Sequence, residues 1–330
     1  MLKQLTEQDI LQLFGQIAQK HKLMVPETLA DGTRALLPWN DHQVELHGQP
    51  LQRKPTCHFF PQTDPLVQLY EDGTVKLSTK ADKPLALFGL GREDLHGIEF
   101  IDRFFAAEPA DDIYLSKRRN AKLIGLTGYA GPNREFLPLA GQYCDIELIT
   151  DKYQWFAAAY SDAGRQLLKH YPDANPQQLA LMQEKSQKII TGQDKKIAEA
   201  AQLLQHKRVP DDFWEEISKR CIRCGGCNFT CPTCTCFCLQ DRHTTTATDR
   251  SRIWDSCQLD AFMREASGHN PLGTDMLRTR RRIHHKLVDD FQRWGELGCI
   301  LCGRCDRACP TGIGMYTICD EIISRFGDSV

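Results

Sequence analysis

The sequence lacks both an excess of charge of one sign and a long apolar run. Lys and Arg number 41 against 43 Asp and Glu, a formal net charge of −2, and this balance does not indicate a protein that binds nucleic acid. No run of about 18 apolar residues is present, so we expect no membrane insertion. Polar residues at 7–9 interrupt the amino-terminal apolar pattern. We therefore expect no secretory signal and a cytoplasmic location.

Cysteine is nearly absent from the first two thirds of the chain. Cys57 and Cys144 are the only cysteines in the first 220 residues, whereas 13 of the 15 lie between Cys221 and Cys319. A disulfide-rich secreted domain would explain such clustering, but no export signal accompanies it. In a cytosolic chain, cysteines clustered in this way indicate metal binding.

The 330 residues, 41% hydrophobic and 25% charged, are typical of a globular chain of about two domains. Apolar residues recur at helical spacing over 7–20, with Thr6 as the N-cap. Residues 85–88 form an apolar run of strand length, 95–105 return to helical spacing, and 122–126 form a second run. Strand, helix, strand predicts a parallel βαβ unit.

Shorter patterns complete the outline of the N-terminal part. Apolar runs at 35–37 and 75–77, and the stretch 145–160, predict further strands, whereas 162–220 is mostly helical in pattern. The turn Gly89-Leu90-Gly91 invites a dinucleotide-binding interpretation. That fingerprint needs Gly or Ala where this chain has Asp94. We therefore favour a tight turn between strand and helix.

Two cysteine motifs are the strongest signal in the chain. CIRCGGCNFTCP begins at Cys221 and CILCGRCDRACP begins at Cys299, and both match the C-x2-C-x2-C-x3-C-P run of bacterial two-cluster ferredoxins. Three cysteines two residues apart wrap one iron–sulfur cube, and the fourth points away to ligate the other cube. Glycines after the second cysteine let the backbone approach the cluster. Zinc is the alternative, but its tetrahedral sites use pairs of ligand pairs.

This logic predicts two [4Fe–4S] clusters with crossed ligation. The first cluster takes its ligands mainly from the first motif and the second mainly from the second motif, each with one ligand from the other motif. The predicted ligands of cluster 1 are Cys221, Cys224, Cys227 and Cys309, and those of cluster 2 are Cys299, Cys302, Cys305 and Cys231.

Five of the thirteen clustered cysteines lie outside the two motifs. They are Cys234, Cys236, Cys238, Cys257 and Cys319. They could ligate a third metal centre. More often, cysteines near a cluster pack as small apolar residues or hydrogen-bond its sulfides, which would make Cys234, Cys236 and Cys257 neighbours of the clusters rather than ligands.

The 67 residues between Cys231 and Cys299 are long for a minimal ferredoxin, and their apolar pattern predicts helices. A basic run extends from Arg278 to Lys286. Such a run is usually a solvated helix face. Here it could also offset the negative charge of thiolate-ligated clusters or contact a partner.

Several further motifs resemble one family. CPTCTCF at 231–237, R-x-R-x-W-D-S-C at 250–257, SGHN at 267–270 and CxxCGRCxxxCP at 299–310 resemble the iron–sulfur β subunit of cytoplasmic sulfhydrogenases, which are nickel–iron hydrogenases, and the related iron–sulfur subunit of anaerobic sulfite reductase. A weaker likeness covers 59–70 and the βαβ block. Many members carry cysteines in that block, where this chain has Glu93 and Gly128.

The resemblance implies an electron-transfer subunit that binds no small substrate itself. In such complexes a flavin-containing reductase subunit exchanges electrons with a nicotinamide cofactor, and the β-type subunit passes them to a catalytic redox subunit. No catalytic residues are visible in this chain. Two alternatives stay open, a self-sufficient iron–sulfur flavoenzyme reductase and a protein whose clusters are purely structural.

The expected fold is α+β. We expect an α/β docking domain with a βαβ unit over 1–160, a helical linker over 161–215, and a ferredoxin-like domain with two [4Fe–4S] clusters and a helical insertion over 216–330. Because residues 1–215 offer only Cys57 and Cys144, we expect that region to bind no cluster.

Overall fold

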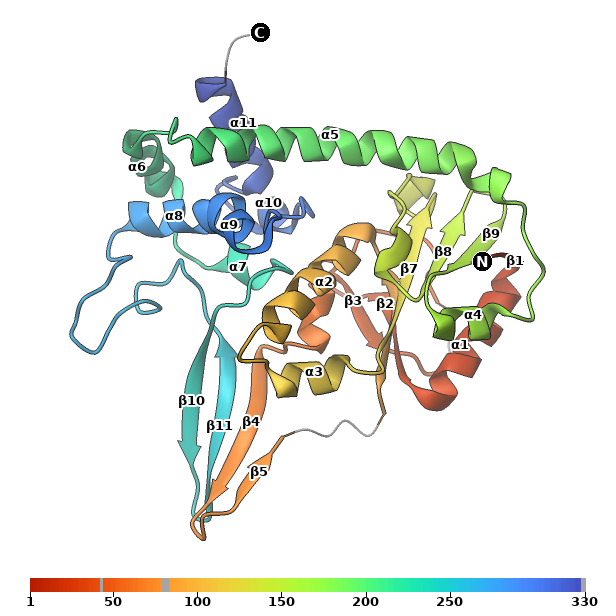
Figure 1. Cartoon of the computed structure of the whole chain (residues 1–330), viewed down its shortest axis with the longest axis horizontal. Helices are drawn as coiled ribbons and strands as arrows, with labels where there is room; N and C mark the ends of the chain where they lie inside the picture. The colour runs from red at the N-terminus through yellow and green to blue at the C-terminus, as the bar shows by residue number, and fades with distance from the viewer. Residues whose placement is uncertain (42–43, 79–82, 328–330) are drawn as a thin grey trace. The chain divides into compact units, whose positions relative to one another are not determined.

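The computed structural model describes residues 1–41, 44–78 and 83–327 (Figure 1). The chain forms two compact units. The first contains Met1–Phe60 and Ser78–Ile190, and the second contains Pro61–Leu77 and Thr191–Val330. The mixed α+β fold expected from the sequence is confirmed. The predicted boundaries at residues 160 and 215 stay a proposal.

A seven-stranded mixed sheet organises the first unit, in the order β1-β9-β8-β7-β6-β2-β3. Strands β2, β6, β7 and β8 run parallel, whereas β1, β9 and β3 pair antiparallel with their neighbours. The strands are β1 (Leu2–Leu5), β2 (Lys22–Thr28), β3 (Arg34–Pro38), β6 (Leu85–Leu90), β7 (Lys122–Gly128), β8 (Ile146–Thr150) and β9 (Trp155–Ala159).

Helices and short 3-10 turns connect the strands of this sheet. The α-helices of the first unit are α1 (Glu7–Lys20), α2 (Arg92–Ala106), α3 (Asp112–Arg118) and α4 (Asp162–Leu168), and the short 3-10 turns are η1 (Pro55–His58), η2 (Pro132–Arg134), η3 (Gly141–Tyr143) and η4 (Pro176–Leu179). The predicted βαβ unit is confirmed, because α2 connects β6 to its parallel neighbour β7. The stretch 145–160 forms the antiparallel strands β8 and β9.

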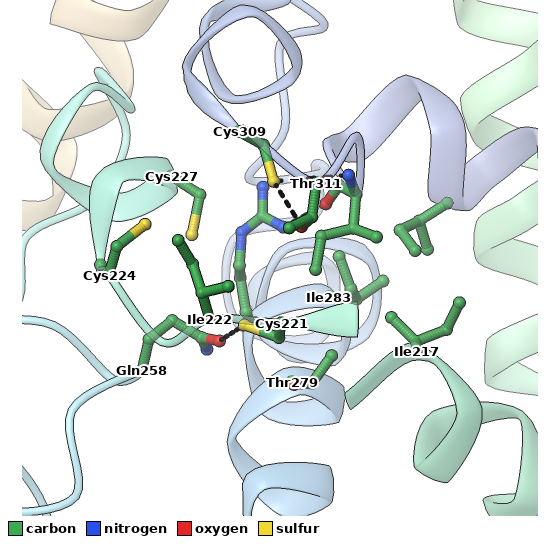
Figure 2. Close-up of a pocket in the computed structure, with 14 residues that line it drawn as sticks. Ile217, Cys221, Ile222, Cys224, Cys227, Gln258, Thr279, Ile283, Cys309 and Thr311 are labelled. Atoms are coloured by element: carbon green, nitrogen blue, oxygen red, sulfur yellow. Dashed lines mark hydrogen bonds between the residues drawn. The ribbon is translucent and has the colours of Figure 1, made fainter. Parts of the chain in front are cut away.

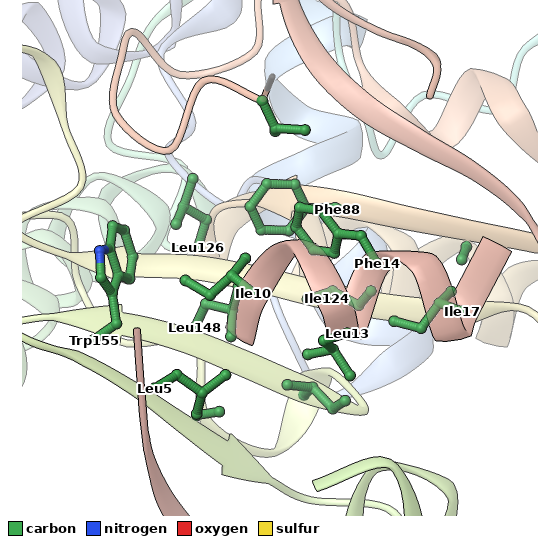
Figure 3. Close-up of a cluster of buried hydrophobic side chains, with 14 of the residues drawn as sticks. Leu5, Ile10, Leu13, Phe14, Ile17, Phe88, Ile124, Leu126, Leu148 and Trp155 are labelled. Atoms are coloured by element: carbon green, nitrogen blue, oxygen red, sulfur yellow. The ribbon is translucent and has the colours of Figure 1, made fainter. Parts of the chain in front are cut away.

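The core of the first unit is the apolar face of α1 against the sheet. Thr6 caps α1 as predicted, since its hydroxyl accepts from the N–H of Asp9. Figure 3 shows Phe14 of α1 beside Phe88 of β6, and their ring centroids are 4.6 Å apart. The other labelled side chains around them include Ile10, Leu13, Ile17, Leu126 and Leu148.

The turn that resembles a dinucleotide fingerprint is explained by local geometry. Asp94 accepts a hydrogen bond from the N–H of Gly91 at 3.3 Å, which caps the start of α2. Gly89 has a φ of +84°, and a Cβ there would meet the ring of Pro26. The acidic residue thus occupies a helix N-terminus where a phosphate would bind, and a tight turn is the interpretation that the structure supports.

A four-stranded antiparallel sheet belongs to the second unit, in the order β10-β11-β4-β5. Its strands are β4 (Thr63–Tyr70), β5 (Val75–Leu77), β10 (Phe237–His243) and β11 (Ala247–Trp254). The helical prediction for the segment between the two motifs is therefore wrong over 237–254, where the chain forms a hairpin. The β10–β11 hairpin lies beside the β4–β5 hairpin in this sheet, because β11 pairs with β4.

The cysteine-rich part of the second unit is helical. Its elements are α6 (Asp211–Arg220), α7 (Gly226–Phe229), α8 (Asp275–His284), the π-helical turn η5 (His285–Asp289), α9 (Asp290–Trp294), α10 (Arg304–Ala308) and α11 (Met315–Phe326). The boundary between the units falls within α5 (Ala180–Gln205). Helices between the two motifs, α8 and α9, are present as predicted. Among the described residues, no helix has both the length and the apolar character needed to cross a membrane.

Candidate metal centre

The two cysteine motifs fold into the same local backbone shape. In each, the residue before the second cysteine is left-handed, Arg223 with a φ of 58° and Leu301 with a φ of 50°. The glycine after that cysteine is left-handed too, Gly225 with a φ of 71° and Gly303 with a φ of 68°, and a short helix follows. Left-handed non-glycine residues are uncommon. Their repetition at matched positions shows that the sequence repeat is also a structural repeat.

The first hollow brings together cysteines from both motifs (Figure 2). Cys221, Cys224 and Cys227 of the first motif line it together with Cys309, the last cysteine of the second motif. The hollow has a volume of about 490 Å³ including its open mouth. The rest of its lining is largely apolar, and comprises Ile217, Ile222, Ile283, Ile313 and Ile318 beside Gly225, Gln258, Thr279, Arg282 and Thr311.

The second hollow repeats this arrangement with the motifs exchanged. Cys299, Cys302 and Cys305 of the second motif line it together with Cys231, the last cysteine of the first motif, and Cys227 also reaches it. Its volume is about 380 Å³. Helices α7 and α10, one from each motif, pack against each other. The fold therefore gathers the eight cysteines of the predicted ligand sets into two hollows.

Backbone N–H groups point at several of these sulfur atoms. The N–H of Arg223 donates to Sγ of Cys221 at 3.4 Å, and that of Met315 donates to Sγ of Cys305 at 3.3 Å. The N–H of Ile313 lies 3.4 Å from Sγ of Cys309. Donors of this kind favour the thiolate over the thiol and lower the electron density on a ligating sulfur.

The buried thiols must lose their protons to bind metal. Burial raises the pKa of Cys227 to about 11 and that of Cys305 to about 12. Metal binding to such groups releases protons, since only the thiolate is a ligand. Cys309 has a lowered pKa even though burial opposes the shift, because Thr311 and the Ile313 N–H hydrogen-bond its sulfur.

The basic run separates into a buried face and an outer face. Arg278, Arg282 and Lys286 recur every four residues and are 5%, 8% and 4% exposed. Arg280 and Arg281 lie on the outer face and pair with Asp211 and Asp289. The sequence prediction located the run but did not divide it into faces. The buried cations recur every four residues, and Ile283 and Leu287 follow Arg282 and Lys286 directly on the same side of the helix. This spacing is the sequence signal that could have identified the buried face.

Buried cations face the cysteines. Arg282 lines both hollows, and Lys286 lines the second. Burial alone would lower the pKa of Arg282, but the sulfurs of Cys227 and Cys305 raise it overall. Thr233, which the sequence motifs did not single out, lines the second hollow beside Lys286.

Four of the five remaining cysteines lie in varied environments. Cys257 is buried, and its sulfur accepts from Nδ2 of Asn228 at 3.1 Å. Hydrogen bonding from Cys236 lowers the pKa of Cys257 to about 6. Cys238 is exposed on β10, whereas Cys319 is buried in the apolar core of the second unit on α11.

Cys234 is hydrogen-bonded to Cys231, a lining residue of the second hollow. The proposal that Cys234, Cys236 and Cys257 are neighbours of the clusters stays open. In the first unit, Cys57 is half-buried in η1 and Cys144 is buried. Glu93 lies in the first turn of α2, and Gly128 ends β7 with a φ of 72°.

The hollows fit an iron–sulfur cluster in their donor set. Each presents the four thiols of one predicted ligand set, an apolar lining and a facing cation, which are the features that hold and stabilise a thiolate-ligated anionic cluster. Throughout the ranges that the structure describes, no three His, Cys, Asp or Glu side chains are gathered as ligands of one metal ion. A cube of four irons is much larger than one ion and spreads its ligands accordingly.

Comparison with known proteins agrees with this class. Residues 220–313 match the family model of a 4Fe-4S dicluster domain. The chain thus contains an iron–sulfur domain of the dicluster type, and the match spans both cysteine motifs and the segment between them. No solved structure matches the chain.

Two curated proteins extend the likeness beyond that domain. The chain is 25% identical to sulfhydrogenase 2 subunit beta of Pyrococcus furiosus over 308 residues, which cover 90% of this chain and 86% of the relative. It is 24% identical to F420-dependent formate dehydrogenase subunit beta of Methanocaldococcus jannaschii over 183 residues, which cover 53% of this chain and 40% of that relative. The resemblance to a sulfhydrogenase β subunit is confirmed.

Proposed function

We propose that this chain is a cytoplasmic electron-transfer subunit that relays electrons through two [4Fe–4S] clusters. It would receive them from a flavin-containing reductase subunit, then deliver them to a catalytic redox subunit of an oxidoreductase complex, of hydrogenase or sulfite reductase type. The observation that carries the proposal is the exchange of the last cysteine between the motifs, so that Cys309 lines the first hollow and Cys231 the second.

The ligand sets follow from the same exchange. Cys221, Cys224, Cys227 and Cys309 would hold cluster 1, and Cys299, Cys302, Cys305 and Cys231 would hold cluster 2. A [4Fe–4S] cluster supplies a centre that accepts and returns one electron at a time. The chain's own residues would fix the position of each cluster, exclude water with isoleucine side chains, and donate N–H groups to the ligating sulfurs.

The first unit would act as a docking domain that carries no cluster. Its two cysteines, Cys57 and Cys144, lie on separate elements, η1 and the end of the η3 turn. Partners that deliver or collect electrons would then have to contact the cysteine-rich part of the chain.

Iron analysis and electron paramagnetic resonance test the proposal. Anaerobically purified or reconstituted protein should contain about eight irons and eight sulfides per chain, and dithionite should reduce both clusters. Cys305→Ser should lose or convert one cluster, whereas Cys238→Ser, at an exposed cysteine of β10, should keep both. Iron near four per chain, stoichiometric zinc, or clusters that dithionite cannot reduce would contradict the proposed function.

A further inference from the structure

Lys286 is a buried cation held against the second hollow. It is only 4% exposed and lies in the π-helical turn η5, a rare conformation that is frequent at functional sites. Its Nζ atom donates to Oγ1 of Thr233 at 2.7 Å and lies 3.3 Å from the carbonyl oxygen of Gly298. The carbonyl of Lys286 also accepts from the N–H of Gly298 at 2.8 Å. Lys286 therefore contacts Gly298, the residue immediately before Cys299, through both its side chain and its backbone.

Thr233 connects this ammonium group to the other motif. Its Oγ1 hydroxyl donates to the carbonyl oxygen of Gly298 at 2.6 Å and lies 3.3 Å from Sγ of Cys231. A threonine hydroxyl has one proton to donate, and here that proton is directed to Gly298. The oxygen of the same hydroxyl accepts from the Lys286 ammonium. Thr233 therefore holds that ammonium group beside the Cys231 sulfur.

The two hollows differ in the charge that faces them. Arg282 lines both, whereas Lys286 and Asp306 line only the second. Asp290 lies on the same stretch of helix as Lys286 and is also buried, and a Cβ at Gly298 would meet its carboxylate. These two carboxylates offset part of the Lys286 charge. Asp306 lies beside Cys305, with Oδ2 3.5 Å from Sγ, whereas the Lys286 ammonium bonds to Thr233, the neighbour of the Cys231 sulfur.

We propose that Lys286, held in place by Thr233, raises the midpoint potential of the second cluster. The inference rests on the proposed function, because it presupposes that both clusters are bound. Reduction adds one negative charge to a cluster. A buried cation stabilises that charge more than it stabilises the oxidised state. Lys286 would therefore favour reduction of the cluster held by Cys231, Cys299, Cys302 and Cys305.

Redox titration followed by electron paramagnetic resonance tests the assignment in the full chain. Lys286→Met keeps the length of the side chain and removes its charge. The midpoint potential of the second cluster, identified as the cluster that Cys299→Ser removes, should fall by about 59 mV, which is a tenfold change in the one-electron reduction equilibrium constant, while the other midpoint moves less. Lys188→Met is the matched control, since Lys188 pairs with Glu184 on the exposed surface of α5, and both midpoints should stay unchanged.

A second pair of variants tests the inference if the Lys286→Met protein does not bind the second cluster. Thr233→Val removes the hydroxyl and should lower the same midpoint by a smaller factor, whereas Thr233→Ser keeps the hydroxyl and should leave it unchanged. An unchanged midpoint of the second cluster in Thr233→Val, or in a Lys286→Met protein that binds both clusters, overturns the inference. An equal fall in Thr233→Ser does so too. A wild-type chain that never binds two reducible clusters would instead refute the proposed function.

Discussion

A buried ion pair joins two segments that lie far apart in sequence. Arg252 of β11 lies directly opposite Asp64 of β4 in the sheet register. The guanidinium donates to the carboxylate at 2.6 Å, and the two side chains are 2% and 1% exposed. Removal of one charge from such a pair leaves the other charge buried without its partner. The pair thus fixes which strands meet, in addition to what it contributes to stability.

We predict that Arg252→Met lowers the free energy of unfolding by about 3–5 kcal/mol, because it leaves the Asp64 carboxylate buried and uncompensated. The double variant Asp64→Asn/Arg252→Met should be more stable than Arg252→Met alone, since neither charge then remains. Chemical denaturation followed by fluorescence measures both values.

The control for this prediction lies in the same hairpin. Arg250 and Asp241 are also cross-strand partners, but their side chains are 42% and 34% exposed. Arg250→Met should therefore change stability little. Equal destabilisation by Arg250→Met and Arg252→Met would show that burial of the pair is not what matters.

At the level of elements, α6 delivers the first cysteine of the first motif. The helix ends at Arg220, immediately before Cys221, and buries Phe213, Trp214 and Ile217. Trp214 is 0% exposed, and its ring lies 5.0 Å from that of Phe213 and 5.7 Å from that of His284 of α8. Ile217 of the same face lines the first hollow. The apolar face of α6 therefore positions one wall of that hollow.

We predict that Trp214→Ala destabilises the second unit by about 3–5 kcal/mol, as truncation of a large buried aromatic residue does. Glu215→Ala, on the exposed side of the same helix, should stay within about 0.5 kcal/mol of the wild type. Thermal unfolding under anaerobic conditions measures both. A Trp214→Ala protein as stable as Glu215→Ala would mean that α6 is not anchored by this face.

Elements with local signals could be predicted from the sequence, whereas those that depend on distant pairing could not. The sequence of helix α1 contains an N-cap at Thr6 and apolar residues at helical spacing, and both are local signals. The hairpin over 237–254 shows no strong alternation of apolar and polar residues. Most of β10 is exposed, so its fold does not require apolar residues at alternate positions. Its strand identity comes from pairing with β4, which lies more than 150 residues earlier. Sequence periodicity detects burial on one face and contains no information on such a partner.

The same division applies to the candidate site. The spacing of the cysteines predicts the two ligand sets, because the motif itself imposes the loop geometry, and the members of each predicted set line one hollow. The buried cations were harder to recognise, since a basic run usually means a solvated helix face. Only the packing of α8 and η5 shows that Arg282 and Lys286 turn inward.

At the scale of the whole molecule, the fold places two copies of one motif so that each contributes its last cysteine to the hollow of the other. Neither motif lines its hollow alone, because each hollow includes the last cysteine of the other motif. The segment between the motifs forms part of both hollows through Arg282. We therefore expect damage to the last cysteine of one motif to affect the cluster held mainly by the other motif.

The most direct measurement is the electron paramagnetic resonance spectrum of reduced Cys309→Ser, recorded beside those of Cys221→Ser and Cys299→Ser. Crossed ligation predicts that Cys309→Ser loses or converts the same cluster as Cys221→Ser, although the two cysteines lie far apart in sequence, and that the cluster affected by Cys299→Ser stays intact. A Cys309→Ser spectrum that instead matches Cys299→Ser would show that each motif ligates its own cluster, and would contradict the account.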